Sequence, residues 1–144
     1  MHASFDTNAV GPMLVAQAFA PLLALSTAPL GPRIINISSR AGSIGSRLTN
    51  EKSAIYDQDM VEYRVSKAAL NMLSVCMQWE YGKLGVRCFC FCPGFTESNL
   101  SPLARVGNGA RRVEVAVGPI VGVVEGERDG EEGGFLVEGG RAGW

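Results

Sequence analysis

Histidine is almost missing from this sequence of 144 residues: the only one is His2, beside the amino terminus. The motif G-x-S-x-G is missing as well. A serine hydrolase needs a histidine base next to a serine that is held on a sharp turn. These two absences therefore argue against that class of enzyme.

Four cysteines are present, but neither a C-x-x-C motif nor a histidine pair accompanies them. Cys88, Cys90 and Cys92 alternate with phenylalanine, and on a β-strand this spacing places three sulfurs on one face. Because a metal site usually needs a second pair of ligands, we expect buried, reduced thiols and no metal ion. Reduced thiols favour a cytoplasmic location.

The chain has no excess of either charge, since 13 basic and 14 acidic residues give a net charge of −1. Without a basic stripe, nucleic acid is not an expected partner. The longest apolar stretch, residues 13–25, is interrupted by Gln17 and Pro21 and is shorter than the roughly 20 residues that cross a bilayer. No charged segment precedes it, so it does not resemble a signal peptide. We therefore expect no membrane partner.

The first part of the chain favours a helix. Residues 6–26 form a mostly apolar segment that predicts a buried helix, with Asp6 or Thr7 as its amino-terminal cap. Gly31 and Pro32 follow and end this segment.

A strand, a helix and a second strand are predicted next. The β-branched run "RIINIS", residues 33–38, predicts a buried strand, and the polar residues 40–59 predict a long loop. A helix is expected over residues 61–81, and "VRCFCFC", residues 86–92, predicts a second buried strand that a Pro-Gly pair ends. This order is a βαβ unit with a right-handed connection. The apolar contacts of its helix are expected from Ala68, Leu70, Leu73, Met77 and Trp79.

The carboxyl-terminal part is rich in glycine: 11 of the 18 glycines come after Pro102. "ARRVEVAVGPIVGVVEG" nevertheless has the apolar rhythm of a helix, and "GGFLVEGG" has that of a short strand. Glycine loses much entropy on ordering, so disorder of this part is the alternative interpretation.

Tyr63 and Lys67 lie four residues apart in the predicted helix, so their side chains share one helical face. A cation about 4 Å from the phenol oxygen is worth roughly 4 kcal/mol at an effective dielectric constant of 20, or about three pKa units. Such a tyrosine exchanges protons near neutral pH. With three tyrosines and three lysines in the chain, however, one Y-x-x-x-K can also arise by chance.

Four motifs follow one another in the sequence: "TNAVG", "NISS", "YRVSK" and "CPGFTES". In open α/β sheets, polar groups at the carboxyl ends of parallel strands bind ligands. In this order the motifs resemble the short-chain dehydrogenase/reductase family, over about residues 5–99. The resemblance implies an α/β fold, a partial Rossmann-like doubly wound sheet of about three parallel strands with flanking helices. We expect one domain over residues 1–144, with a catalytic half (1–101) and a glycine-rich segment (102–144).

The family's chemistry is the NAD(P)-dependent interconversion of a carbonyl compound and an alcohol. By this resemblance Tyr63 exchanges a proton with the substrate oxygen, and Lys67 lowers the pKa of Tyr63 and holds the nicotinamide ribose. Ser39 hydrogen-bonds the substrate oxygen, and Asn8 holds a water behind the lysine. Taken alone, Asn8 is also explained as a helix cap and Ser39 as a loop hydroxyl. The implied cofactor-binding residues are Tyr63, Lys67, Pro93, Gly94, Phe95, Thr96 and Ser98.

The glycine-rich turn that binds the pyrophosphate of a dinucleotide is not found before Asn8. "GNGARRVE", residues 107–114, has Arg112 in place of the third glycine, and no predicted strand precedes it. We therefore expect a truncated chain that lacks the cofactor half, and the choice between NAD and NADP stays open. The alternative is a non-catalytic protein that associates with itself or with an intact homologue.

Overall fold

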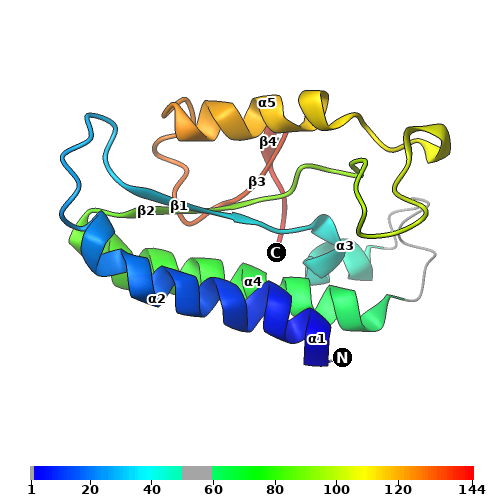
Figure 1. The fold of residues 1–144 in the computed structure, drawn as a ribbon, viewed down its shortest axis with the longest axis horizontal. Helices are drawn as coiled ribbons and strands as arrows, with labels where there is room; N and C mark the ends of the chain where they lie inside the picture. The colour runs from blue at the N-terminus through cyan, green and yellow to red at the C-terminus, as the bar shows by residue number, and fades with distance from the viewer. Residues whose placement is uncertain (1, 50–59) are drawn as a thin grey trace.

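The computed structural model describes residues 2–49 and 60–144. Three layers are visible: two long helices, α2 and α4, cover one face of a central sheet, and α5 covers the other face (Figure 1). The helices are α1 (His2–Phe5), α2 (Gly11–Leu23), α3 (Ile44–Leu48), α4 (Val61–Tyr81) and α5 (Val113–Val124); the short π-helical and 3-10 segments are η1 (Asp6–Val10), η2 (Arg40–Gly42), η3 (Gly82–Leu84) and η4 (Val106–Asn108).

The sheet has the strand order β1-β2-β3-β4. Its strands are β1 (Arg33–Ile37), β2 (Arg87–Phe91), β3 (Phe135–Val137) and β4 (Gly140–Arg141). The first three are parallel, and β4 returns antiparallel to β3. The α/β class and the parallel sheet are as the sequence predicts. The two-residue strand β4 was not predicted, because so short a strand has no periodicity of its own.

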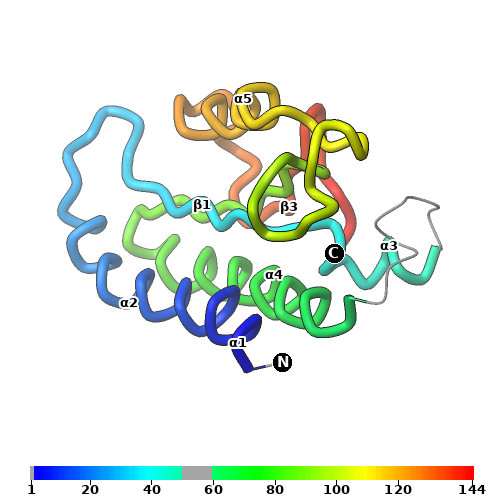
Figure 2. Tube along the Cα trace, turned by 45° about the vertical axis from the view of Figure 1, so that its right-hand side comes forward, coloured from blue at the N-terminus to red at the C-terminus, as the bar shows by residue number. Residues whose placement is uncertain are grey.

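The two connections between parallel strands differ in hand. Both step in the same direction across the sheet, from β1 to β2 and from β2 to β3. The helix of the first, α4, covers one face, and the helix of the second, α5, covers the opposite face (Figures 1 and 2). Two connections with the same step and opposite faces must have opposite hands. One of the two is therefore left-handed, which is rare among such crossovers.

The first helical segment begins earlier and ends earlier than its sequence predicts. Helical backbone runs without a break from His2 to Leu23, through α1, η1 and α2. Asp6 and Thr7 consequently lie inside the helical segment, and their predicted role as caps is wrong. The turn at Gly31 belongs to the loop before β1 and not to the helix end.

The helix α2 is also less buried than predicted. Its small residues Ala16 and Ala20 are buried and belong to the same core cluster as Met77 and Tyr81 of α4. Of its large residues, Leu23 packs against this cluster, whereas the Phe19 side chain is 55% exposed. The small alanine side chains let α2 and α4 approach closely. Most of the larger apolar side chains of α2 remain on the surface.

The helix α4 has the bounds that its sequence predicts, Val61–Tyr81. Leu70 and Met77 are buried as expected, but Trp79 is 76% exposed, so its predicted place in the core is wrong. The ammonium of Lys83 lies 5.0 Å from the Trp79 ring centre, a contact of the surface. The sheet and α2 bury one side of α4 only, and Trp79 lies outside that side.

The predicted long loop contains more structure than expected, whereas the glycine-rich carboxyl-terminal part forms the helix and the strand that its sequence predicts. The described part of the long loop holds η2 and α3, and the rest of the predicted loop, residues 50–59, lies outside the described residues. The glycine-rich carboxyl-terminal part folds into α5, β3 and β4. Its interpretation as a disordered segment is therefore wrong.

The strand β2 is the centre of the core. Phe89 and Phe91 are fully buried and pack with Val123 of α5 and Leu136 of β3. The cysteines of the alternating run are buried as predicted, and desolvation raises the pKa of Cys88 to about 12. Desolvation also raises the pKa of Cys90, to about 11.

None of the described helices has the length and apolar character needed to cross a membrane. No cluster of three or more His, Cys, Asp or Glu side chains suited to a metal ion occurs within residues 2–49 and 60–144.

Candidate active site

Ser39 lies directly after β1, where the chain leaves the sheet. Its backbone is extended, with φ −152° and ψ 141°, and its hydroxyl oxygen accepts a hydrogen bond of 3.1 Å from the amide of Ala41. This bond caps the short helix η2 and fixes the side chain of Ser39 at the carboxyl end of the strand. Such strand ends are where open α/β sheets bind ligands.

Tyr63 lies in the first turns of α4 and faces Ser39. The nearby Ser39 hydroxyl favours the ionised phenol and lowers the pKa of Tyr63. Burial acts more strongly in the other direction, and the charge of Cys92 adds to it, so the pKa of Tyr63 is raised above 10.0. The sequence predicts the opposite direction. The prediction is wrong because it counted the nearby cation and left out the desolvation of the ring.

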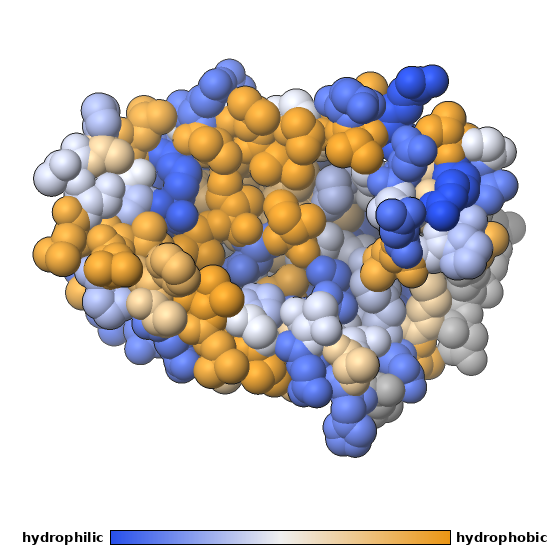
Figure 3. Space-filling model, viewed as in Figure 1, coloured by the Kyte–Doolittle hydropathy of each residue, from blue (hydrophilic) through white to orange (hydrophobic). Residues whose placement is uncertain are grey.

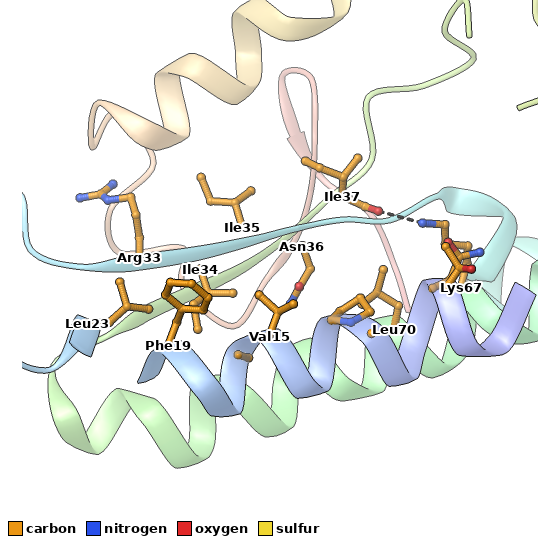
Figure 4. A pocket seen from close by; sticks show the side chains of 15 residues that line it. Val15, Phe19, Leu23, Arg33, Ile34, Ile35, Asn36, Ile37, Lys67 and Leu70 are labelled. Carbon is orange, nitrogen blue, oxygen red and sulfur yellow. Dashed lines mark hydrogen bonds between the residues drawn. The ribbon is translucent and has the colours of Figure 1, made fainter. Parts of the chain in front are cut away.

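Lys67 lies one turn after Tyr63 and is buried, and its ammonium has a backbone partner. The Nζ atom donates a hydrogen bond of 2.9 Å to the carbonyl oxygen of Ile37, the last residue of β1 (Figure 4). It lies 5.9 Å from the centre of the Tyr63 ring. Burial lowers the pKa of Lys67, and the thiols of Cys90 and Cys92 oppose that effect.

Asn8 joins the first helical segment to α4. Its Nδ2 atom donates a hydrogen bond of 3.0 Å to the hydroxyl of Ser66, which in turn donates one of 2.8 Å to the Tyr63 carbonyl. Asn8 therefore contacts α4 between the two residues of the Tyr-Lys pair. The role of Ser66 was not predicted, although its position three residues after Tyr63 places it on a neighbouring part of the helix.

The segment "PGFTES" follows β2, beside the end of β1. The amide of Ser38 donates to the Phe91 carbonyl at 2.7 Å, and the amide of Arg40 donates to the Cys92 sulfur at 3.2 Å. These two bonds hold the exits of β1 and β2 next to each other. The Pro-Gly segment and Ser39 therefore emerge from neighbouring strands.

Gly94 and Thr96 set the path of this segment. Gly94 has a φ of +79°, a left-handed conformation that glycine adopts without steric cost. The hydroxyl of Thr96 donates to the carbonyl oxygens of Pro93 and Gly94, at 3.3 Å each. Ser98 is exposed, and its hydroxyl accepts from the amide of Leu100 at 3.3 Å. The segment is thus a turned loop with an accessible side.

A groove of about 740 Å³ runs along the free side of β1. Its walls are the five residues of β1 and apolar side chains of α2, including Val15, Phe19 and Leu23 (Figure 4). Lys67 and Asn8 lie at one end of the groove, whereas Ser39 and Tyr63 are not among the residues that line it. Figure 3 shows that apolar side chains gather on this face of the molecule.

The four predicted catalytic residues therefore belong to one connected assembly at the carboxyl ends of β1 and β2. A family model described as short chain dehydrogenase matches residues 1–106. The chain belongs to the short-chain dehydrogenase family.

Known members of the family resemble the chain over nearly all of its length. A short-chain dehydrogenase/reductase of Talaromyces stipitatus, tropE, is 30% identical over 94% of this chain and 55% of its own. The structure of an NADPH-bound carbonyl reductase from chicken fatty liver has a TM-score of 0.77 and 31% identity, with 97% of this chain and 55% of that chain covered. The carbonyl reductase Sniffer of D. melanogaster has a TM-score of 0.75 and 27% identity, with the same coverage.

The chain spans about half the length of these short-chain dehydrogenases. The described residues contain groups suited to one end of a dinucleotide: the buried Lys67 ammonium and the accessible turn at Gly94. A glycine-rich turn from a strand into a helix, which suits a pyrophosphate, does not occur in residues 2–49 or 60–144. The glycines of "GNGARRVE" lie around η4, which follows a loop. The fit to the cofactor is therefore partial.

Proposed function

We propose that residues 1–144 are the substrate-side half of an NAD(P)-dependent oxidoreductase that interconverts a carbonyl compound and an alcohol. The observation that carries this proposal is the placement of Ser39 at the end of β1, close enough to the Tyr63 phenol to lower its pKa, with Lys67 one turn further along α4. Two neighbouring hydroxyl groups at a strand end can both approach one substrate oxygen. This arrangement fits proton transfer to or from that oxygen.

Tyr63 is the proton donor or acceptor in this proposal, and Ser39 holds the substrate oxygen. Because burial raises the pKa of Tyr63, the phenol is protonated at neutral pH. A protonated phenol can donate its proton to a carbonyl oxygen, which is the proton transfer that reduction of a carbonyl group requires. The bound nicotinamide would supply the hydride for this direction.

Lys67 and Asn8 support the pair from α4 and η1. A buried ammonium near Tyr63 favours negative charge on the phenol and on the substrate oxygen. Asn8 fixes the turn of α4 between Tyr63 and Lys67 through Ser66. A role of Asn8 in holding a water of the proton path is part of the same proposal.

The segment from Pro93 to Ser98 is the proposed contact with the nicotinamide, through Pro93, Gly94, Phe95, Thr96 and Ser98. Its turned backbone beside the exit of β1 leaves one side open to a planar ring. The choice between NADP and NAD is not part of the proposal, because the described residues hold nothing suited to the adenosine end.

The experiment is a fusion of residues 1–144 behind the amino-terminal half of the chicken carbonyl reductase, which supplies the rest of the fold. We expect the fusion to oxidise NADPH with a panel of ketones. Tyr63→Phe should lower kcat by at least about a hundredfold, the range of general acid catalysis. Tyr81→Phe is the matched control, since Tyr81 lies at the other end of α4. A fusion whose activity survives Tyr63→Phe would contradict the proposed mechanism.

A second candidate function is association with an intact family member without catalysis. The observation that favours it is the number of large apolar side chains on the outer surfaces of α2 and α4. The exposed members of this set are Leu14, Val15, Phe19, Leu22, Val61, Val65, Met72, Val75 and Trp79. Co-purification of the chain with a full-length homologue tests the idea, and no binding at micromolar concentrations would exclude it.

A further inference from the structure

The last two residues of the sequence bind the loop that begins at Ser39. The hydroxyl of Ser43 donates a hydrogen bond of 2.8 Å to the carbonyl oxygen of Gly143. The amide of Gly45 donates one of the same length to the carbonyl oxygen of Trp144. The end of the chain and the described loop are therefore joined along two successive peptide units.

Trp144 is anchored on the sheet. Its ring stacks on that of Phe135 in β3, with ring centres 5.2 Å apart and an interplanar angle of 17°. Phe135 is only 1% exposed and packs with Cys92, whose sulfur accepts the Arg40 amide next to Ser39. The tail thus connects the core of the sheet with the loop after β1.

The opposite side of the same loop packs tightly against α4, with no room for a side chain at Gly42. A Cβ atom at Gly42 would lie 2.5 Å from the Lys67 carbonyl carbon and 2.6 Å from the Ala68 nitrogen. Ser43 is 2% exposed, and its hydroxyl oxygen also accepts from the Ser46 amide at 3.0 Å. The loop therefore lies between the helix that carries Tyr63 and Lys67 and the tail that ends at Trp144.

We propose that Trp144 is a positioning residue for Ser39: with Gly143 it clamps residues 39–46 against α4 and keeps the Ser39 hydroxyl on the Tyr63 phenol. This inference rests on the proposed function, because it assigns the clamp to the same site. Without the ring of Trp144 the last residue loses its contact with Phe135, while the Ala142 amide still donates to the Phe135 carbonyl at 2.8 Å. The hydrogen bonds from Ser43 and Gly45 to the tail then weaken together, and the loop that begins at Ser39 is no longer held from that side.

The first test uses the 144-residue chain and needs no activity. Amide hydrogen exchange over residues 40–48 should be about tenfold faster in Trp144→Ala, the factor that corresponds to the loss of one hydrogen bond. Trp144→Phe keeps an aromatic ring on Phe135 and should restore slow exchange. Trp79→Ala removes the other, exposed tryptophan and should leave the exchange of this loop unchanged. Equal exchange in Trp144→Ala and the parent chain would overturn the clamp.

The second test uses the fusion with the chicken half. Trp144→Ala should lower kcat about tenfold while KM for NADPH stays within about twofold, because only the bond to the substrate oxygen is affected. In a chain that already carries Ser39→Ala, the same change should have no further effect on kcat. Equal effects of Trp144→Ala with and without Ser39 would overturn the positioning role. If Tyr63→Phe leaves the fusion active, the proposed function fails, while the exchange measurement still decides the clamp.

Discussion

The two edges of the sheet end in different ways. At one edge, β3 pairs with β4, a strand of two residues that runs antiparallel. Arg128 and Arg141 both bind the carboxylate of Glu131 beside this edge. Hydrogen bonding and the charge of the two arginines lower the pKa of Glu131 to about 2. A short, charged edge strand offers little for another strand to pair with.

At the other edge, β1 presents five residues to which no strand of the described residues is bonded on the far side. Apolar side chains of β1 and α2 line the groove beside it, and Phe19 is among them. The order of the helices and strands indicates which kind of element would fit beside β1. The helix α2 covers the same face of the sheet as α4, and it leads into β1 as α4 leads into β2 (Figure 2). A strand before α2, joined by a connection of the same hand, would therefore lie beside β1. One edge, the finished edge, is closed by a short strand of the chain itself, and the other is an open edge among the described residues.

The largest expected effect concerns the open edge and the cofactor. We expect the 144-residue chain to bind NADPH or NADH with a dissociation constant above about 1 mM and to show no turnover. It can contact only the nicotinamide end, and losing about 4 kcal/mol of contacts weakens a micromolar affinity roughly a thousandfold. Calorimetric titration of the chain and of the fusion with the chicken half measures the difference. Micromolar affinity of the chain alone would show that residues 1–144 suffice.

A pair of phenylalanines compares the contribution of the two edges to stability. Phe135→Ala at the finished edge should lower the free energy of unfolding by about 3 to 5 kcal/mol, because it empties a buried site and removes the contact with Trp144. Phe19→Ala at the open edge should cost less than about 1 kcal/mol, because that side chain is already exposed. Urea unfolding monitored by circular dichroism measures both. Equal losses of unfolding free energy in the two variants would mean that Phe19 is buried in solution and that the groove beside β1 is closed.

The ion pairs of the finished edge should have a smaller effect, and one that depends on pH. Because the folded state lowers the pKa of Glu131, its contribution is present above about pH 4.5 and is lost as the pH falls toward about 2. Glu131→Gln should therefore lower Tm by about 2 to 4 °C at pH 7 and by less at pH 2.5. Scanning calorimetry at the two pH values measures this, with Glu80→Gln on α4 as the control. A Tm difference that does not shrink in acid would exclude an electrostatic cause.

The smallest effect on folding is expected from a charge placed beside the open edge. The unpaired β1 and its apolar groove favour self-association of the chain. Phe19→Lys should reduce association while the midpoint of urea unfolding stays nearly unchanged, since Phe19 is exposed. Sedimentation velocity over a range of concentrations measures the association. Association as strong as in the parent chain would assign it to another surface, such as the outer side of α4 around Trp79.

The elements that the sequence predicted well are those with a long pattern and a sharp end. The helix Val61–Tyr81 and the strands around "RIINIS" and "RCFCF" lie where their apolar patterns and the Gly or Pro residues after them place them. The residues of the proposed site were predicted from the order of four motifs, and the structure brings Asn8, Ser39, Tyr63 and Lys67 into one assembly.

Features that depend on what lies opposite a side chain were predicted less well. Trp79 is exposed because the surface of α4 around it faces no other described element, and Phe19 because the groove between α2 and β1 leaves it open; helical periodicity cannot show which face is covered. The direction of the Tyr63 pKa was wrong for a similar reason, since burial of the phenol depends on the loop after β1 packing on α4.

The sequence by itself determined the βαβ unit, the polar residues at its strand ends and the spacing of Tyr63 and Lys67, because these follow from local periodicity and turn chemistry. Only the tertiary structure decided which partners these residues take. Lys67 donates a hydrogen bond to the Ile37 carbonyl. Ser43, in the loop after Ser39, donates one to the carbonyl of Gly143, which lies 100 residues further along the chain and next to Trp144. Hydrogen bonds and burial between distant segments depend on how the layers pack, and no short stretch of sequence carries that information.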